Sequence, residues 1–180
     1  LLIVLVLFVV VVTIVANLLP DTLSGTSLVT AGVILAVVPA LIWLGFFYQQ
    51  DRREPEPKSY VVRVFVLGAI LAAGVGIPIV RDLFNVNAWM YTNETINLLG
   101  SILVIGVVEE ALIYAAVRYS VFDSAEFDER VDGIVYATAA GLGFATMLNF
   151  DYVVGHAGVD LGVGVIRVTV TALAHASIAG

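Results

Sequence analysis

The sequence predicts an all-α protein, a polytopic transmembrane helix bundle of about six spans. Of its 180 residues, 61% are hydrophobic and only 13% are charged, whereas soluble domains carry about 25% charged residues. The apolar residues also fall in long runs, and ~20 such residues are enough to cross a bilayer. We therefore expect a single membrane domain over 1–180. Because the chain starts without Met and stops inside an apolar run, we expect it to be a piece of a longer protein.

The first two spans are uncharged apolar runs joined by a turn. Residues 1–16 are rich in β-branched side chains, and Pro20 and Gly25 mark the turn that follows. Residues 28–48 form the second span, and its aromatic residues from Trp43 onward predict a belt at the membrane interface.

The third and fourth spans flank a short polar stretch. The third covers 60–79, and Pro78 is expected to help end it, because proline disrupts a helix. Residues 81–93 then form a polar loop, and the fourth span runs over 94–121.

The last two spans differ in character. The fifth, 133–154, is rich in small residues, which predicts close packing against neighbouring helices. The sixth, 160–180, is rich in Val, Leu and Ala but also contains several polar residues.

Basic residues set the expected orientation. The loops 49–59 and 122–132, with their flanks, contain most of them: Arg52, Arg53, Lys58, Arg118 and Arg130. Lys and Arg are enriched in cytoplasmic loops, so we predict a multi-pass protein of the cell membrane with both loops in the cytoplasm. The net charge of −7 leaves no basic surface for nucleic acid, and the lipid bilayer is the expected environment.

Two adjacent carboxylates, Glu109 and Glu110, lie in the middle of the apolar fourth span. An ionisable group is costly in such a setting unless it is paired, solvated or protonated, and so it indicates a functional site. Because a helix has 3.6 residues per turn, the two side chains point about 100° apart. One Glu can face the bundle centre while the other lies beside a neighbouring helix. A structural ion pair is the alternative reading.

Polar residues also follow one face of the sixth span, which predicts that this face lines the bundle interior or a wet cavity. We call these residues the sixth-span stripe: Asp160, Gly164, Arg167, Thr171 and His175. On the fifth span, Asn149 could donate to a substrate carbonyl, or it could simply bond across helices.

A carboxylate and an imidazole in a wet pocket are suited to hydrolysis. A carboxylate can take a proton from water, and His can bind a metal, protonate a leaving amine or steady an oxyanion. Peptide bonds are the expected substrate at that depth. Glu110 and His175 are also possible metal ligands, although the sequence has no HExxH motif.

Three motifs in order, V-E-E-A-L-I-Y, D-G-I-V-Y-A-T-A-A-G-L-G-F-A-T-M-L-N and H-A-S-I-A-G, resemble the PrsW family of intramembrane proteases. That family is distantly similar to CAAX-processing and bacteriocin-processing membrane proteases. The resemblance runs from about residue 51 to the end. It implies an all-helical protease that cuts a membrane-anchored protein, such as an anti-sigma factor. Its motif residues correspond here to Glu109, Glu110, Asn149 and His175.

The resemblance also suggests roles for these residues. Glu110 would be the general base and Glu109 a supporting carboxylate. His175 would be a metal ligand or an oxyanion donor, and Asn149 a polarising amide. The cofactor stays open. The family is usually classed as metalloproteases, which implies zinc or another divalent metal, whereas the related CAAX enzymes look metal-independent.

Two positions depart from the family pattern. Ile113 stands where E-E-x-x-K has Lys, and Leu148 stands where F-A-x-x-E-N has Glu. One alternative is therefore a protease-dead relative that binds membrane segments without cutting them. A second alternative is an ion- or proton-coupled transporter that uses the buried charges as a path.

Overall fold

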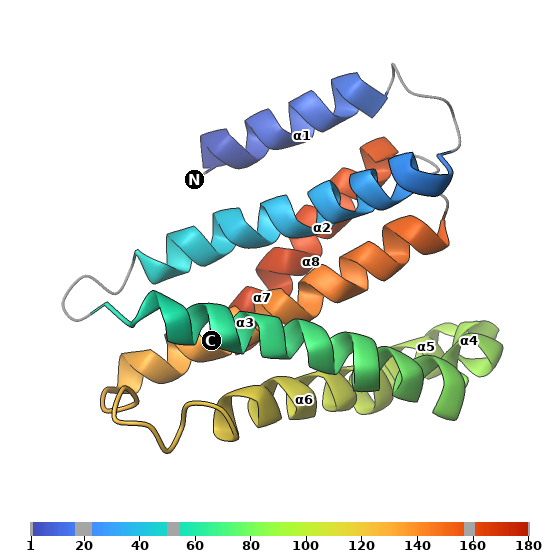
Figure 1. The fold of residues 1–180 in the computed structure, drawn as a ribbon. Helices are drawn as coiled ribbons and strands as arrows, with labels where there is room; N and C mark the ends of the chain where they lie inside the picture. The colour runs from blue at the N-terminus through green and yellow to red at the C-terminus, as the bar shows by residue number, and fades with distance from the viewer. Residues whose placement is uncertain (1, 17–22, 50–54, 157–160, 180) are drawn as a thin grey trace.

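The computed structural model of the chain describes residues 2–16, 23–49, 55–156 and 161–179, and the regular elements in these ranges are all helices. Six α-helices form the main body of the bundle (Figure 1). They are α1 (Leu2–Ala16), α2 (Gly25–Tyr48), α3 (Lys58–Leu71), α6 (Val107–Arg118), α7 (Arg130–Gly155) and α8 (Leu161–Ala179). The predicted all-α fold is confirmed for the described residues.

The stretch between α3 and α6 is more helical than the sequence suggested. The helix continues past Pro78. One π-helical segment, η1 (Ala72–Gly76), precedes this proline, and a second, η2 (Ile79–Leu83), follows it. The prediction that Pro78 helps end the span is wrong. Its backbone angles are helical (φ −60°, ψ −41°), and π turns shift hydrogen-bond partners along the chain, so its missing N–H is tolerated.

The predicted polar loop at 81–93 is also mostly helical. It contains the end of η2, the short helix α4 (Val86–Trp89) and a 3₁₀ turn, η3 (Met90–Thr92). Then α5 (Glu94–Gly100) begins, with the Asn93 side chain accepting a hydrogen bond from the backbone N–H of Ile96 at 2.8 Å. A third π segment, η4 (Ser101–Gly106), joins α5 to α6. Local capping by short polar side chains therefore replaced the expected irregular loop.

Four stretches in the described part of the chain are long and apolar enough to cross a membrane: Gly25–Tyr48, Lys58–Thr92, Glu94–Arg118 and Arg130–Gly155. The apolar stretches of α1 and α8, Ile3–Val15 and Gly164–Ala179, are shorter. At 1.5 Å per residue they fall short of the ~30 Å hydrocarbon core. The structure thus supports four of the about six predicted spans.

Helix α7 is the centre of the bundle and packs most extensively against α3, α2 and α8. Its glycines make this possible, as the small-residue composition predicted. A Cβ at Gly143 would lie 1.9 Å from the carbonyl oxygen of Phe65 on α3. A Cβ at Gly141 would lie 2.9 Å from the carbonyl oxygen of His175 on α8. The backbones of α3 and α8 therefore lie directly on α7.

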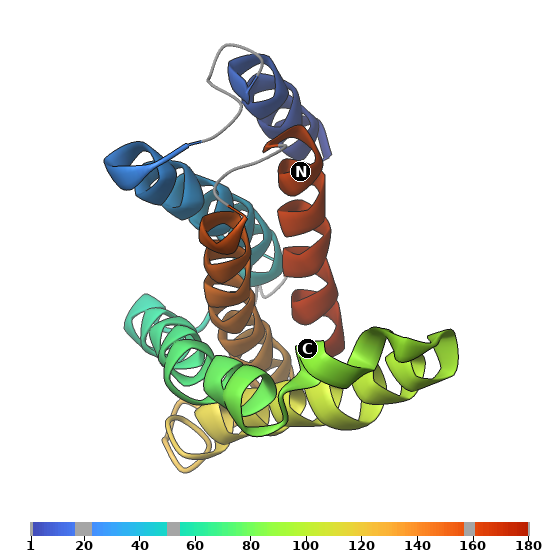
Figure 2. The same cartoon turned by 90° about the vertical axis from the view of Figure 1, so that its right-hand side faces the viewer.

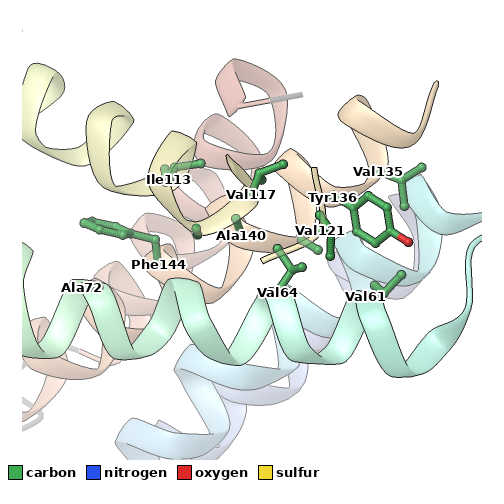
Figure 3. Close-up of a cluster of buried hydrophobic side chains, with 12 residues drawn as sticks. Val61, Val64, Ala72, Ile113, Val117, Val121, Val135, Tyr136, Ala140 and Phe144 are labelled. Carbon is green, nitrogen blue, oxygen red and sulfur yellow. The ribbon is translucent and has the colours of Figure 1, made fainter. Parts of the chain in front are cut away.

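The main core lies between α3, α6 and α7 (Figure 3). Tyr136 and Phe144 are its largest fully buried side chains. Trp43 belongs to a second core cluster and is only 7% exposed. The prediction that the aromatic belt begins at Trp43 is therefore wrong, because this side chain of α2 points into the bundle and not outward.

The described parts of the two predicted cytoplasmic loops, 49–59 and 122–132, lie at one end of the bundle. Residues 55–57 and 125–132 line a common depression. The Glu56 carboxylate accepts a hydrogen bond from the hydroxyl of Tyr136, and the Glu56 carbonyl accepts one from Tyr48. This common position is what the predicted cytoplasmic location of both loops requires, since the two must share a side.

Candidate active site

The structure brings together one glutamate and the histidine that the sequence singled out. Nε2 of His175 on α8 lies 3.3 Å from Oε2 of Glu109 on α6, and both side chains are largely buried, with 13% and 17% exposed. The two helices meet here although 66 positions separate the residues along the chain, from 109 to 175. A carboxylate and an imidazole thus face each other inside an otherwise apolar bundle.

The contact of the second ring nitrogen of His175, Nδ1, indicates which tautomer the imidazole adopts. Nδ1 is 3.2 Å from the carbonyl oxygen of Thr171, and a carbonyl oxygen only accepts, so Nδ1 carries a hydrogen. With Nδ1 protonated, the short contact between Nε2 and the Glu109 carboxyl is favourable when one further proton lies between them. A carboxyl and an imidazole at this distance can exchange a proton, which is what general acid–base chemistry requires.

The position of His175 is fixed by its neighbours on α7. The Phe144 ring stacks on the imidazole with centroids 6.1 Å apart and an interplanar angle of 17°. Gly141, three residues earlier on α7, touches the His175 backbone. Nε2 lacks a well-aligned hydrogen bond to any described residue, and catalytic contacts are often loose without substrate.

A cavity of about 440 Å³ opens beside the Glu109–His175 pair. It runs between the π-helical part of the third span, α6, α7 and α8. Its charged and polar lining residues are Arg81, Asn87, Glu109, Asp151, Tyr152, His156, Arg167 and Thr171. Figure 2 shows α8 (red) standing beside α7 (orange), with the yellow-green span of α5 and α6 diverging from it. Of the pair, Glu109 lines the cavity, and His175 lies beside it.

The sixth-span stripe, which lies on α8, behaves as the sequence predicted where the structure describes it. Arg167 and Thr171 line the cavity, and His175 contacts Glu109. Gly164 is buried, and Asp160 lies outside the described residues. A polar face on an apolar helix therefore identified the cavity wall.

Glu110 is placed differently from Glu109. It is half-buried, does not line the cavity and makes no hydrogen bond or ion pair with another described residue. Its charge interacts with both His175 and Glu109 through space. The sequence did not indicate which glutamate lies beside the neighbouring helix. In the structure it is Glu109 that contacts His175.

Asn149 lies away from the pair. It is fully buried, and its Nδ2 donates to the carbonyl oxygen of Val168 at 3.1 Å, tying α7 to α8. Val168 is seven residues before His175, which is about 10 Å along the helix at ~1.5 Å per residue. The bond across helices is the plainer of the two predicted roles for Asn149, and its Oδ1 has no partner among the described residues.

The two departures from the family pattern have different surroundings. Leu148 lines the cavity together with Glu109. Ile113 is 2% exposed and belongs to the main core (Figure 3). An acidic residue at position 148 would face the cavity, whereas the apolar residue at position 113 fills space between α3, α6 and α7.

The donor set fits a resident metal poorly. Glu109 and His175 are two ligands, and a catalytic zinc site commonly has three protein ligands. No group of three or more His, Cys, Asp or Glu side chains suited to a metal occurs in the described ranges. Leu148 contributes no ligand to the nearby wall. The residues present therefore do not make up a usual catalytic zinc site.

Sequence reasoning missed several polar residues of the cavity, among them Arg81, Asp151 and His156. Arg81 forms ion pairs with Asp82 at 3.4 Å and with Asp151 at 3.5 Å. Asp151 follows the asparagine motif closely on α7, which was the available signal. Arg81 was assigned to a loop, and only the helical course of η2 places it against α7.

The sequence is similar to one family of known proteins over most of its length. A model described as PrsW family intramembrane metalloprotease matches residues 56–180. The chain is similar to Protease PrsW of Bacillus subtilis (strain 168), with 34% identity over 135 residues, covering 72% of this chain and 55% of that protein. It is similar to Protease PrsW of Geobacillus kaustophilus (strain HTA426), with 32% identity over 142 residues, covering 76% and 56%.

A third relative is Protease PrsW of Clostridioides difficile (strain 630), with 30% identity over 143 residues, covering 79% of this chain and 59% of that protein. The chain thus spans somewhat more than half the length of these curated relatives. No solved structure matches it.

Proposed function

The chain belongs to the PrsW family of intramembrane metalloproteases, and from that premise we propose that it hydrolyses peptide bonds of a membrane-anchored protein. The observation that supports this most is the Glu109–His175 contact, 3.3 Å long, on the wall of the cavity of about 440 Å³. Family membership gives the reaction class, and the contact gives two residues able to perform it.

The reaction begins with the pair as carboxylate and imidazolium. Glu109 takes a proton from a water molecule in the cavity, and the water oxygen attacks the carbonyl carbon of the scissile bond. A tetrahedral intermediate forms with its charge on the former carbonyl oxygen. His175 then donates its Nε2 proton to the leaving nitrogen, and the C–N bond breaks to give an acid and an amine. The proton on Glu109 returns to His175 and restores the pair.

The two glutamates exchange the roles that the sequence suggested. Glu109 lines the cavity and contacts His175, which supports it as the base. Glu110 does not line the cavity, and its charge acts on His175 through space, which supports it as a carboxylate that stabilises the imidazolium. Asn149 keeps α8 in register with α7 through Val168, and this makes it a positioning residue.

We propose a metal-free route, as a resemblance to CAAX-processing enzymes would imply. We expect cleavage to survive removal of divalent metal by a chelator, because the described donor set offers only Glu109 and His175. Loss of cleavage on chelation, with recovery on adding zinc, would contradict this part of the proposal.

The protein crosses the membrane several times, with residues 49–59 and 122–132 in the cytoplasm. The common position of residues 55–57 and 125–132 supports a shared side. Arg81, Asp151 and the first turns of α8 lie at the other end of their helices, so the cavity opens toward the outer face. A substrate segment just outside the membrane would then reach the site.

A second candidate function is substrate binding without cleavage. Leu148 supports it, because an apolar side chain occupies the cavity wall where the family commonly has Glu. Purified protein in liposomes separates the two functions when it is incubated with membrane-anchored peptides in ¹⁸O-labelled water. Hydrolysis places ¹⁸O in the new carboxyl group, and mass spectrometry locates the cut. Stable complexes without any labelled product would favour binding alone.

A further inference from the structure

The cavity contains one cation that lacks a counterion among the described residues. Four of its lining residues are Asp, Glu, Lys or Arg: Arg81, Glu109, Asp151 and Arg167. Arg81 is paired with Asp151, and Glu109 contacts His175. Arg167 has no carboxylate within ion-pair distance in the described ranges. The reaction proposed above makes no use of it.

The Arg167 guanidinium stacks on an aromatic ring of the neighbouring helix. Its guanidinium carbon lies 3.7 Å from the centroid of the Tyr152 ring on α7. The centroids of the Tyr152 and His156 rings are in turn 4.2 Å apart. A guanidinium group stacked on an aromatic face keeps its N–H edges free for a planar anion. A carboxylate accepts two parallel hydrogen bonds from such an edge.

The spacing along α8 sets the distance from Arg167 to the chemistry. Arg167, Thr171 and His175 follow one another at intervals of four residues on one face. The eight residues from Arg167 to His175 rise about 12 Å at ~1.5 Å per residue. An extended peptide covers that distance in about three or four residues at ~3.3 Å each.

We propose that Arg167 is a specificity subsite for an acidic side chain of the substrate, located about three or four residues from the cleaved bond. This rests on the proposed function for the identity of the reacting pair. The acidic residue lies toward the open end of the cavity, and Thr171 lines the path between the two positions.

Two measurements on the same protein test the subsite: crosslinking reports peptide binding, and hydrolysis reports cleavage. Membrane-anchored peptides that contain a photo-crosslinker receive a single Asp at each of six successive positions on either side of the bond. They are reconstituted with the protein in zwitterionic liposomes. We expect Asp at the third or fourth position on one side to strengthen crosslinking and to lower KM about ten-fold, the size of one charge-assisted hydrogen bond.

Three variants show whether Arg167 is responsible. Arg167→Gln should remove the preference, and Arg167→Lys should retain only part of it, because an ammonium group lacks the planar fork. Arg167→Glu should reverse it, favouring a peptide with Lys at the same position. Arg63→Gln is the matched control, since Arg63 also stacks on an aromatic ring, that of Tyr60 at 5.1 Å, but does not line the cavity. It should leave the preference unchanged.

Several outcomes would overturn the proposal. One is an Asp preference that survives in Arg167→Gln, and another is a preference equal at all positions. A third is binding that depends on Arg167 only in liposomes with anionic lipid, which would assign the residue to a lipid headgroup. Arg167-dependent crosslinking without any cleavage would refute the proposed hydrolysis and leave the subsite standing. Cleavage indifferent to the acidic residue would do the reverse.

Discussion

The close approach of α3 and α7 at Gly143 gives a sharp test of the fold. In Gly143→Ala the new Cβ would lie 1.9 Å from the carbonyl oxygen and 2.8 Å from the carbonyl carbon of Phe65. It would also lie 3.1 Å from the backbone nitrogen of Ala69. All three are backbone atoms of α3, which cannot rotate away as a flexible side chain would.

The expected cost follows from these distances. Ordinary contact begins near 3.4 Å, so α3 must retreat by about 1.5 Å at Phe65. Overpacking typically costs ~1–3 kcal/mol, and a clash with backbone belongs at the upper end. The higher helix propensity of Ala returns up to ~1 kcal/mol. We therefore expect the free energy of unfolding to fall by about 2 kcal/mol.

Reversible unfolding in mixed micelles, followed by tryptophan fluorescence, measures this change. Gly45→Ala is the matched control, because Gly45 lies within α2 and a Cβ there meets no atom within 4 Å. It should stabilise by up to ~1 kcal/mol. Equal stabilities for the two variants would refute the direct packing of the α3 backbone on α7.

Three further predictions concern the site and the ends of the bundle. Gly141→Ala brings a Cβ to 2.9 Å from the His175 carbonyl oxygen. The displaced histidine should lower kcat about ten- to hundred-fold, and stability should fall less than in Gly143→Ala because the overlap is smaller. An unchanged kcat would contradict the positioning role. Tyr136→Phe removes the hydrogen bond to the buried Glu56 carboxylate and should lower the free energy of unfolding by ~1–3 kcal/mol. The control Tyr114→Phe, at an exposed site, should leave it unchanged. Equal melting temperatures for the two variants would argue against the buried bond. Since the chain has no cysteine, Ser59→Cys should react with a membrane-impermeant thiol reagent only in inverted vesicles, and labelling in intact cells would reverse the proposed orientation.

The sequence predicted the helices well because their signal is local. Long apolar runs locate the helices without knowledge of their neighbours, and the glycines of α7 indicated close packing. The course of the chain from Pro78 to Asn93 was not predictable in this way. Its π turns are held by backbone hydrogen bonds such as that from the Phe84 N–H to the Ile79 carbonyl oxygen at 2.9 Å, and hydrophobic periodicity does not distinguish such turns from an α-helix.

The candidate site was predicted in part for a related reason. Periodicity placed Arg167, Thr171 and His175 on one face of α8, and the structure places all three at or beside the cavity. Periodicity also separated Glu109 from Glu110 by about 100°. It could not tell which of the two faces His175, because that depends on how α6 is rotated against α8.

The Arg81–Asp151 ion pair shows the same limit. The two residues come from stretches 70 positions apart, and nothing local marks them as partners. Leu148 illustrates the opposite case. Its departure from the family pattern was visible in the sequence, but its place on the cavity wall required the packing of α6 and α7.

Peptide hydrolysis by the parent protein, Glu109→Gln and Glu110→Gln, measured side by side in liposomes, tests the central claim most directly. Gln keeps the shape of Glu but cannot accept the proton, and a general base contributes typically ~10²–10⁴-fold. The account predicts that Glu109→Gln loses cleavage by at least about a hundred-fold, while Glu110→Gln loses clearly less, with both variants folded to the same melting temperature. Parental cleavage by Glu109→Gln, or a greater loss in Glu110→Gln, would contradict it.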